Sequence, residues 1–153
     1  MNYLTTEELE VCWEVRRTCS CDQLRRVTRF ATHLYDNGMV PSGLKVTQLP
    51  ILVGLGSEGD LPLSVLADRL ALDRTTLTRN LKVLEDRGLI RTYEHESDAR
   101  VRMVSMTLEG SATLKGALEH WALVQAHVEE RFGRDRLRAL EDELAAFSEA
   151  LNA

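Results

Sequence analysis

Apolar residues recur at steps of three and four along both ends of the chain, which is the period of an amphipathic helix. The segment 5–36 offers two helix starts, a capping box at Thr5–Glu8 and a similar pattern at Ser20–Gln23, so it fits either one bent helix or two. The later stripe runs through Leu114, Leu118, Trp121, Gln125, Val128 and Phe132 and, beyond Gly133, through Leu137, Leu140, Leu144, Phe147 and Leu151. Such stripes pack helix against helix, so both ends are predicted to be helical layers.

The middle of the chain contains shorter predicted elements. The segment Lys45–Gly56 predicts a buried helix, provided that Pro50 lies in its first turn. A short helix is expected at about 63–70, followed by a tight turn at Ala71-Leu72. This pair of features indicates the first half of a helix-turn-helix.

A longer helix begins after the N-cap residue Asp73 and ends at Gly88, where glycine suits a left-handed C-cap. The period then changes, and residues 89–93 and 101–106 predict a hairpin with the polar loop Glu94–Arg100 at its tip. A short helix, a turn, a longer helix and a hairpin follow one another in a winged helix-turn-helix. The predicted fold is therefore mostly α (α+β), one domain of residues 1–153 with a DNA-binding lobe at 44–107 and helical dimerisation regions at 5–36 and 108–151.

The helix that follows Asp73 has two chemically opposite faces. At about 100° per residue, Leu77, Leu81 and Leu84 fall on one side and must face a core. The opposite side carries hydroxyl and cationic groups that suit base edges and phosphates in a major groove. A solvated helix surface has the same composition, but the order of the neighbouring elements favours a DNA-reading helix. The predicted contacts are Arg74, Thr75, Thr76, Thr78, Arg79 and Lys82.

Several short motifs appear in a specific order from Leu63 to Gly110. They are Leu66–Leu70, Asp73–Arg79, Leu84–Arg91, Asp98-Ala99-Arg100 and Thr107-Leu108-Glu109-Gly110. In these residues the chain resembles the MarR (multiple antibiotic resistance regulator) family of bacterial transcription regulators. The resemblance implies that Asp98 stabilises the wing by pairing with an arginine and that Arg100 enters the minor groove. Arg102, which also lies in the predicted hairpin, is a further predicted DNA contact. Many relatives have glycine in the turn where this chain has Ala71, which implies a slightly strained or altered turn.

The charge distribution is compatible with DNA binding by one face only. The chain of 153 residues has a net charge of -5, which excludes a uniformly basic nucleic-acid-coating protein. Residues 63–105 hold eight lysines and arginines against seven acids, a net +1, and the rest of the chain holds eleven against seventeen, a net −6. Acidic charge is thus kept largely off the proposed DNA-binding lobe.

The helical stripes at both ends exceed what a lone winged helix needs, which predicts a two-fold homodimer on a palindromic site. An intramolecular helical bundle is the alternative. The resemblance further implies that a small aromatic ligand releases DNA, although no residue here identifies such a ligand.

Three cysteines are too few for a disulfide framework, so a cytoplasmic location is expected. Cys12 and Cys19 share a helix face, whereas Cys21 lies about 200° from Cys19 and can converge with it only if the helix breaks at 18–20. Arg16, Arg17, Arg25 and Arg26 place positive charge beside these thiols. They are therefore candidates for sensing a thiol-reactive inducer, with small buried apolar residues as the alternative.

Other functional classes lack support in the sequence. No metal site is expected, because His120 and His127 share a face but no ligand cluster completes them. Gly54-x-Gly56-x-x-Gly59 follows a predicted helix rather than a strand, so it does not indicate a dinucleotide site. No cofactor, membrane span or catalytic activity is expected. The favoured function is a sequence-specific DNA-binding regulator, expected to be a repressor, and the alternative is a helical protein-binding adaptor that has lost DNA contact.

Overall fold

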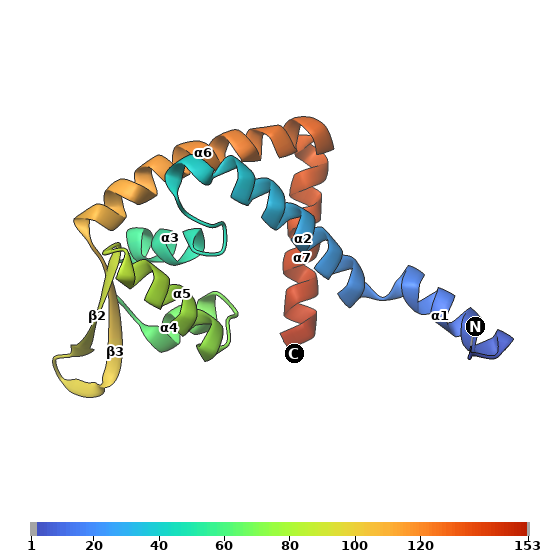
Figure 1. The fold of residues 1–153 in the computed structure, drawn as a ribbon, viewed down its shortest axis with the longest axis horizontal. Coiled ribbons are helices and arrows are strands. Elements are labelled where there is room, and N and C mark those ends of the chain that lie inside the picture. Colours follow the sequence, from blue (N-terminus) through green and yellow to red (C-terminus); the bar gives the residue numbers. More distant parts are fainter. Residues whose placement is uncertain (1–2, 153) are drawn as a thin grey trace. The chain divides into compact units, whose positions relative to one another are not determined.

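The structure is a computed structural model that describes residues 3–152. The chain divides into two compact units, Met1–Leu34 and Tyr35–Ala153. In order, the helices and strands are α1 (Thr6–Thr18), α2 (Ser20–Gly38), the 3-10 helix η1 (Val40–Ser42), α3 (Leu49–Glu58), β1 (Leu61–Pro62), α4 (Leu63–Arg69), α5 (Arg74–Asp86), β2 (Ile90–His95), β3 (Asp98–Met106), α6 (Leu108–Phe132) and α7 (Arg134–Asn152), labelled in Figure 1. The predicted fold class, mostly helical with a winged helix-turn-helix, is confirmed.

The segment 5–36 forms two helices rather than one. Cys19, between α1 and α2, has an extended backbone with φ -65° and ψ 101°. The capping box that opens α1 is present, since Thr5 Oγ1 accepts a bond from the Glu8 amide and the Glu8 carboxylate accepts one from the Thr5 amide at 2.7 Å. The second expected cap is displaced by one residue, because α2 includes Ser20 itself and the Gln23 amide donates to the carbonyl of Cys19.

The helix predicted over Lys45–Gly56 begins later than expected. Residues before it form a turn closed by the buried Gln48, and α3 starts at Leu49 with Pro50 in its first turn. The first-turn position of Pro50 is therefore confirmed. The core-facing residues are Leu49, Ile51, Leu52 and Leu55, whereas Val53, within the segment predicted to be buried, is exposed.

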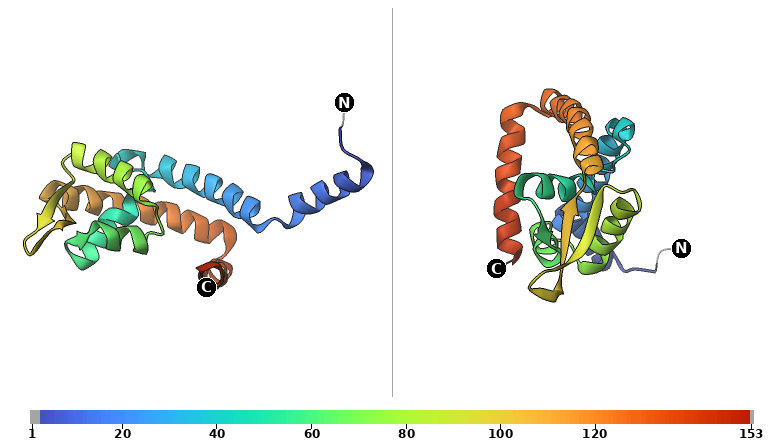
Figure 2. Two further views of the ribbon diagram at one scale, coloured as in Figure 1. Left: turned by 90° about the horizontal axis from the view of Figure 1, so that it is seen from below. Right: turned by 90° about the vertical axis from the view of Figure 1, so that its left-hand side faces the viewer.

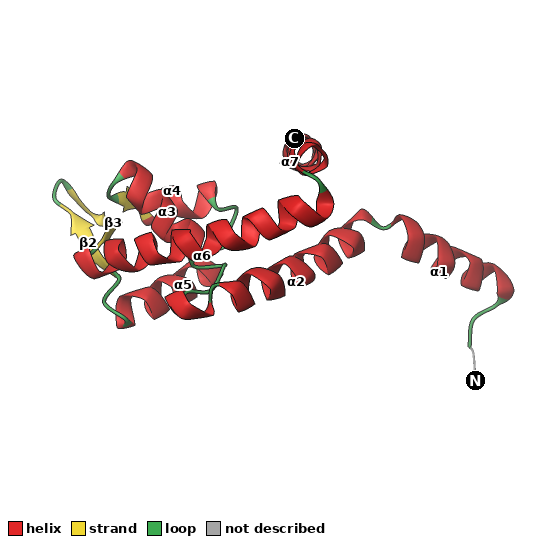
Figure 3. Cartoon of the chain, turned by 90° about the horizontal axis from the view of Figure 1, so that it is seen from above, coloured by secondary structure: helices red, strands yellow, loops and turns green. Residues whose placement is uncertain are grey.

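The wing is a tighter hairpin than the sequence predicted. Strands β2 and β3 leave only residues 96–97 between them, so the expected loop Glu94–Arg100 is mostly strand. Antiparallel pairing with a bulge at Glu94/His95 extends the ladder to the tip. The short strand β1, which the sequence did not predict, pairs with the other side of β3 and gives the order β1-β3-β2. Figure 3 shows the hairpin projecting beyond the helices of its unit.

We call residues 44–107 the recognition lobe. Its core contains the three inward leucines of α5, Leu77, Leu81 and Leu84, as predicted, together with α3, α4 and the sheet. Helix α6 closes this core with Leu114 and Ala117. Gly110 allows α6 to approach the backbone of Leu89 closely, because a Cβ placed at this position would lie 2.0 Å from the carbonyl oxygen of Leu89.

We call α1, α2 and α7 the terminal helices. None of them contains a buried residue in the described part of the chain. Beyond Gly133 the chain turns sharply from α6 into α7 (Figure 2). The predicted stripe of α6 is covered only in part, since Leu114 is buried whereas Leu118 and Trp121 are 41% and 37% exposed. None of the helices in residues 3–152 combines the length and hydrophobicity needed to cross a bilayer.

Candidate nucleic-acid interface

The start of α5 is fixed by its own cap. Asp73 Oδ1 accepts a bond from the Thr76 amide at 2.8 Å, and Oδ2 accepts one from the Thr76 hydroxyl at 2.6 Å. These bonds stabilise the carboxylate and lower the pKa of Asp73. Thr76, predicted as a DNA contact, therefore has its hydroxyl proton committed to the cap. The first turn of α5 is held in place without any DNA.

The other predicted residues of α5 lie together on one exposed surface. A depression of about 520 Å³ is lined by Arg74, Thr75, Thr78, Arg79 and Lys82. All five residues are exposed, and the buried leucines occupy the opposite side of the helix. This surface therefore presents cationic donors and hydroxyl groups, the chemistry that base edges and phosphates require.

The hydroxyl of Thr78 has a defined role within that surface. It donates to the Arg74 carbonyl at 2.7 Å, so only its lone pairs remain for a partner. Asn80, not predicted as a site residue, similarly binds the Thr76 carbonyl at 3.1 Å. Both contacts are internal to the helix, so the cationic side chains of this surface carry most of its outward donor capacity.

The wing borders the same surface. One depression, of about 450 Å³, is lined by Arg74, Thr78 and Lys82 of α5 together with Thr92 and Arg102 of the hairpin. A second, of about 470 Å³, brings Arg74, Arg100 and Arg102 together with residues of α4, Ser64 and Asp68. Ser64 was not predicted from the sequence as a site residue. A hydroxyl residue at the start of the first helix of the helix-turn-helix was the feature that could have indicated it.

The wing tip carries an ion pair. Asp98 Oδ1 accepts bonds from the Arg100 amide at 3.0 Å and from Arg100 Nε at 3.1 Å, which lowers the pKa of Asp98. The arginine partner of Asp98 is therefore Arg100, the residue expected to enter the minor groove. Its side chain is 92% exposed. The guanidinium is thus both held by a neighbour and open to a ligand.

A side-chain bridge joins the wing to the end of α5. Glu85 Oε1 accepts bonds from the amide and the hydroxyl of Thr92, each at 2.8 Å. The Thr92 hydroxyl in turn accepts a bond from Arg102 at 3.3 Å, and Arg102 lies 3.7 Å from Glu94. Arg102 is therefore held along the hairpin. Nothing in the helical or strand period marked Glu85 or Thr92 in advance.

The base of the wing has its own polar contact. The Tyr93 hydroxyl donates to Asp60 Oδ2 at 2.7 Å. This bond lowers the pKa of Asp60 and raises the pKa of Tyr93. It joins β2 to the residue just before β1, across the three-stranded sheet.

The cysteines lie in and beside the two N-terminal helices. Cys12 and Cys21 are exposed, and Cys19 is half-buried at the break between α1 and α2. Within a single chain, Cys12 and Cys21 are therefore not buried, contrary to the alternative interpretation, and Cys19 is partly covered. In the described part of the chain, no group of three or more histidine, cysteine or acidic residues is placed to hold a metal ion.

Comparison with known proteins gives one consistent result. A model of the MarR family matches residues 42–101. The transcriptional regulator MosR of M. tuberculosis, solved in complex with DNA, is 36% identical and superposes with a TM-score of 0.76, covering 88% of this chain and 99% of that one. A second MosR structure is 38% identical with a TM-score of 0.73, covering 87% and 97%. The HTH-type transcriptional regulator YhbI of Bacillus subtilis is 25% identical over 119 residues, 78% of this chain and 77% of its own.

Proposed function

The chain belongs to the MarR family of winged-helix transcription regulators, and from that premise we propose that it is a repressor that binds a palindromic operator as a homodimer. One observation carries the proposal. The leucines of α5 are buried, while Arg74, Thr75, Thr78, Arg79 and Lys82 line one exposed surface beside the wing. That is the arrangement a reading helix needs in a major groove.

We assign different tasks to the residues of this surface. Arg79 and Thr75 read base edges. A guanidinium forms two hydrogen bonds with guanine, and a threonine hydroxyl can hydrogen-bond to different bases because it both donates and accepts. Arg74, Lys82 and Arg102 neutralise phosphates, and Thr78 accepts bonds through its lone pairs. Arg100 enters the minor groove from the tip of the wing.

A second copy of this chain would cover the apolar faces that one chain leaves uncovered. Leu140, Leu144 and Phe147 of α7 are exposed, as is Trp121 of α6. Exposed apolar stripes of this extent mark an interaction surface. A two-fold dimer would place two α5 helices about 34–36 Å apart, one turn of DNA.

The release signal is proposed to act on the cysteines or through a small aromatic ligand. The observation that favours the cysteines is the helix break at Cys19, which removes the 200° separation that a continuous helix imposes between Cys19 and Cys21. If the thiols sense an oxidant, hydrogen peroxide will release the wild-type protein from DNA but not a variant carrying Cys19→Ser and Cys21→Ser. Equal release of both proteins would exclude these thiols.

The proposed function is tested by selection of a binding site from a random duplex library, followed by titration in a mobility-shift assay. We expect an enriched palindrome of about 16–20 bp, as two reading helices one turn apart require. Arg79→Ala should weaken binding to that site by about 1–3 kcal/mol, the value of one good base contact. Failure to enrich any sequence would favour the adaptor hypothesis.

A further inference from the structure

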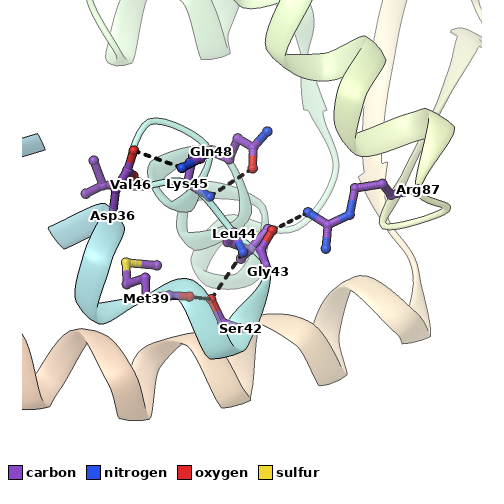
Figure 4. Close-up of polar contacts among 9 residues, drawn as sticks. All are labelled: Asp36, Met39, Ser42, Gly43, Leu44, Lys45, Val46, Gln48 and Arg87. Atoms are coloured by element: carbon purple, nitrogen blue, oxygen red, sulfur yellow. Dashed lines mark hydrogen bonds and ion pairs between the residues drawn. The ribbon is translucent and has the colours of Figure 1, made fainter. Parts of the chain in front are cut away.

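The residue that ends α5 is tied to the segment that follows α2. Arg87 Nη1 donates a hydrogen bond of 2.8 Å to the carbonyl oxygen of Gly43, a residue 44 positions earlier (Figure 4). Arg87 occupies the C-cap of α5, and the outward cationic residues lie between Arg74 and Lys82. The helix has 13 residues, so its two ends are separated by about 20 Å. Arg87 therefore holds α5 at the end farthest from its capped start.

Gly43 is suited to receive this arginine. It closes η1 with φ 69°, in the left-handed region, and its amide donates to the Val40 carbonyl. A Cβ at this position would lie 3.2 Å from Arg87 Nη2. A side chain here would therefore both strain the backbone and crowd the guanidinium.

The segment around Gly43 is itself held by side-chain bonds to the backbone. Asp36 Oδ1 accepts a bond from the Val46 amide at 2.8 Å, and Asp36 Oδ2 lies 3.4 Å from Lys45 Nζ. Ser42 bonds the Met39 carbonyl at 2.7 Å and accepts a bond from the Leu44 amide at 3.2 Å. Figure 4 shows these contacts gathered around the turn that leads from α2 to α3. The Gly43 carbonyl is thus a fixed point relative to the last turn of α2.

We propose that Arg87 is a positioning residue for DNA recognition: by binding the Gly43 carbonyl it sets the angle at which the outward face of α5 meets the groove. This inference rests on the proposed function of α5 as a reading helix. The buried leucines, including Leu84 near this end, pack one face of the helix against the core, and the Arg87 bond adds a directional contact to the segment before α3. Hydrogen bonds to base edges tolerate only a few tenths of an ångström, so a small tilt costs specific contacts.

A direct contact of Arg87 with a phosphate is the competing explanation, and salt dependence separates the two. Each phosphate contact contributes about 0.9 to the slope of log affinity against log salt. Loss of a positioning bond leaves that slope unchanged. Arg87→Lys gives a second discrimination, because lysine keeps the charge but ends one bond short of Nη1. If Arg87 positions α5, Arg87→Lys will behave like Arg87→Met, and if it neutralises a phosphate, Arg87→Lys will behave like wild type.

The experiment is fluorescence anisotropy with the full chain, on the duplex enriched by selection and on a scrambled duplex, each over a salt series. We expect Arg87→Met to weaken binding to the selected duplex by roughly 3- to 30-fold, the range for residues that act at a distance from a ligand. Binding to the scrambled duplex and both salt slopes should stay at wild-type values. Arg134→Met, which removes the same charge from an exposed ion pair with Glu129, is the matched control and should leave all values unchanged.

Two results would overturn the inference: wild-type affinity of Arg87→Met for the selected duplex, or a salt slope reduced by about one unit together with wild-type behaviour of Arg87→Lys. Failure of the wild-type chain to bind any duplex would instead overturn the proposed function.

Discussion

The helices of the recognition lobe and the terminal helices show the same spacing of apolar residues, but they differ in whether the resulting apolar faces are buried. In the lobe, Leu52, Leu77 and Leu84 are completely buried. The terminal helices bury none of their described residues, although α7 repeats leucine and phenylalanine at similar spacing. The period of apolar residues therefore shows which face of a helix needs a partner. It does not show whether the partner lies in the same chain.

Polar contacts differ between the lobe and α1. In the lobe they join different elements, such as Glu85 of α5 with Thr92 of β2, and Arg87 contacts Gly43, just before the lobe. In α1 they are local, as between Thr18 and the Glu14 carbonyl one turn earlier. The lobe is therefore braced by its own chain, and α1 gains no comparable brace from its internal contacts.

The largest expected effect disrupts the packing of α6 against the core of the lobe, at Gly110. Gly110→Ala places a methyl group against the Leu89 carbonyl and should reduce the free energy of unfolding by about 3 kcal/mol or more, the upper range for overpacking. Urea denaturation followed by circular dichroism measures this change. Gly116→Ala is the matched control, because its Cβ meets open space and alanine favours the helix by about 1 kcal/mol. Equal stability of the two variants would contradict the packing described here.

A second change tests whether the terminal helices need another copy. Leu144→Glu places a charge on the exposed stripe of α7 and should weaken a dimer by about 2–3 kcal/mol over its two copies, as expected for lost apolar burial. Light scattering during size-exclusion chromatography should then show a monomer at low micromolar concentration, with the lobe still folded. A wild-type chain that is already monomeric would favour the intramolecular bundle.

A smaller change should stabilise the lobe. Ala71 has φ 48°, the only positive value at a non-glycine residue in residues 3–152, and it follows α4 where the Leu72 amide bonds the Ala67 carbonyl. This is the position that glycine normally occupies at a helix end. Ala71→Gly should therefore raise the free energy of unfolding by about 0.5–1 kcal/mol, after the entropy that glycine loses on folding. A lower midpoint of urea denaturation for Ala71→Gly than for the wild-type chain would contradict the proposed backbone strain at Ala71.

The smallest effect is a pH dependence confined to the wing. Because the folded-state pKa of Asp98 is lowered, the Asp98–Arg100 pair contributes fully above the ordinary aspartate pKa and is lost as pH falls through the lower folded value. The protection of the wing-tip amides, measured as their exchange rate relative to that of an unprotected amide at the same pH, should therefore be constant at neutral pH and fall only in acid. In Asp98→Asn, which mimics the protonated side chain, the lower protection should appear at every pH.

Sequence reasoning succeeded where a local rule decides the structure. The inward leucines of α5 and the first-turn position of Pro50 follow from helix geometry. The strained backbone of Ala71 was implied by the family resemblance, because relatives have glycine at that turn. It failed where distant segments decide. Strand β1 has two residues and exists only because β3 pairs with it, and the tip of the hairpin is ordered by cross-strand bonds that no local pattern indicates.

The candidate site divides along the same line. The outward side chains of α5 share a surface because they share a helix, which periodicity can predict. Arg87 contacts Gly43, 44 residues away, and Glu85 contacts Thr92, 7 residues away. Both contacts depend on the tertiary fold, which the helical or strand repeat of the sequence does not indicate.

The ion pair at the wing tip has a consequence for selectivity. An arginine that is already neutralised by a carboxylate gains less from the diffuse negative potential around any duplex than an unpaired arginine does. Arg100 would leave Asp98 only at a DNA site where its contacts in the minor groove are more favourable than the ion pair. The ion pair therefore weakens non-specific attraction of the wing to DNA and makes its binding depend more on the shape of the minor groove.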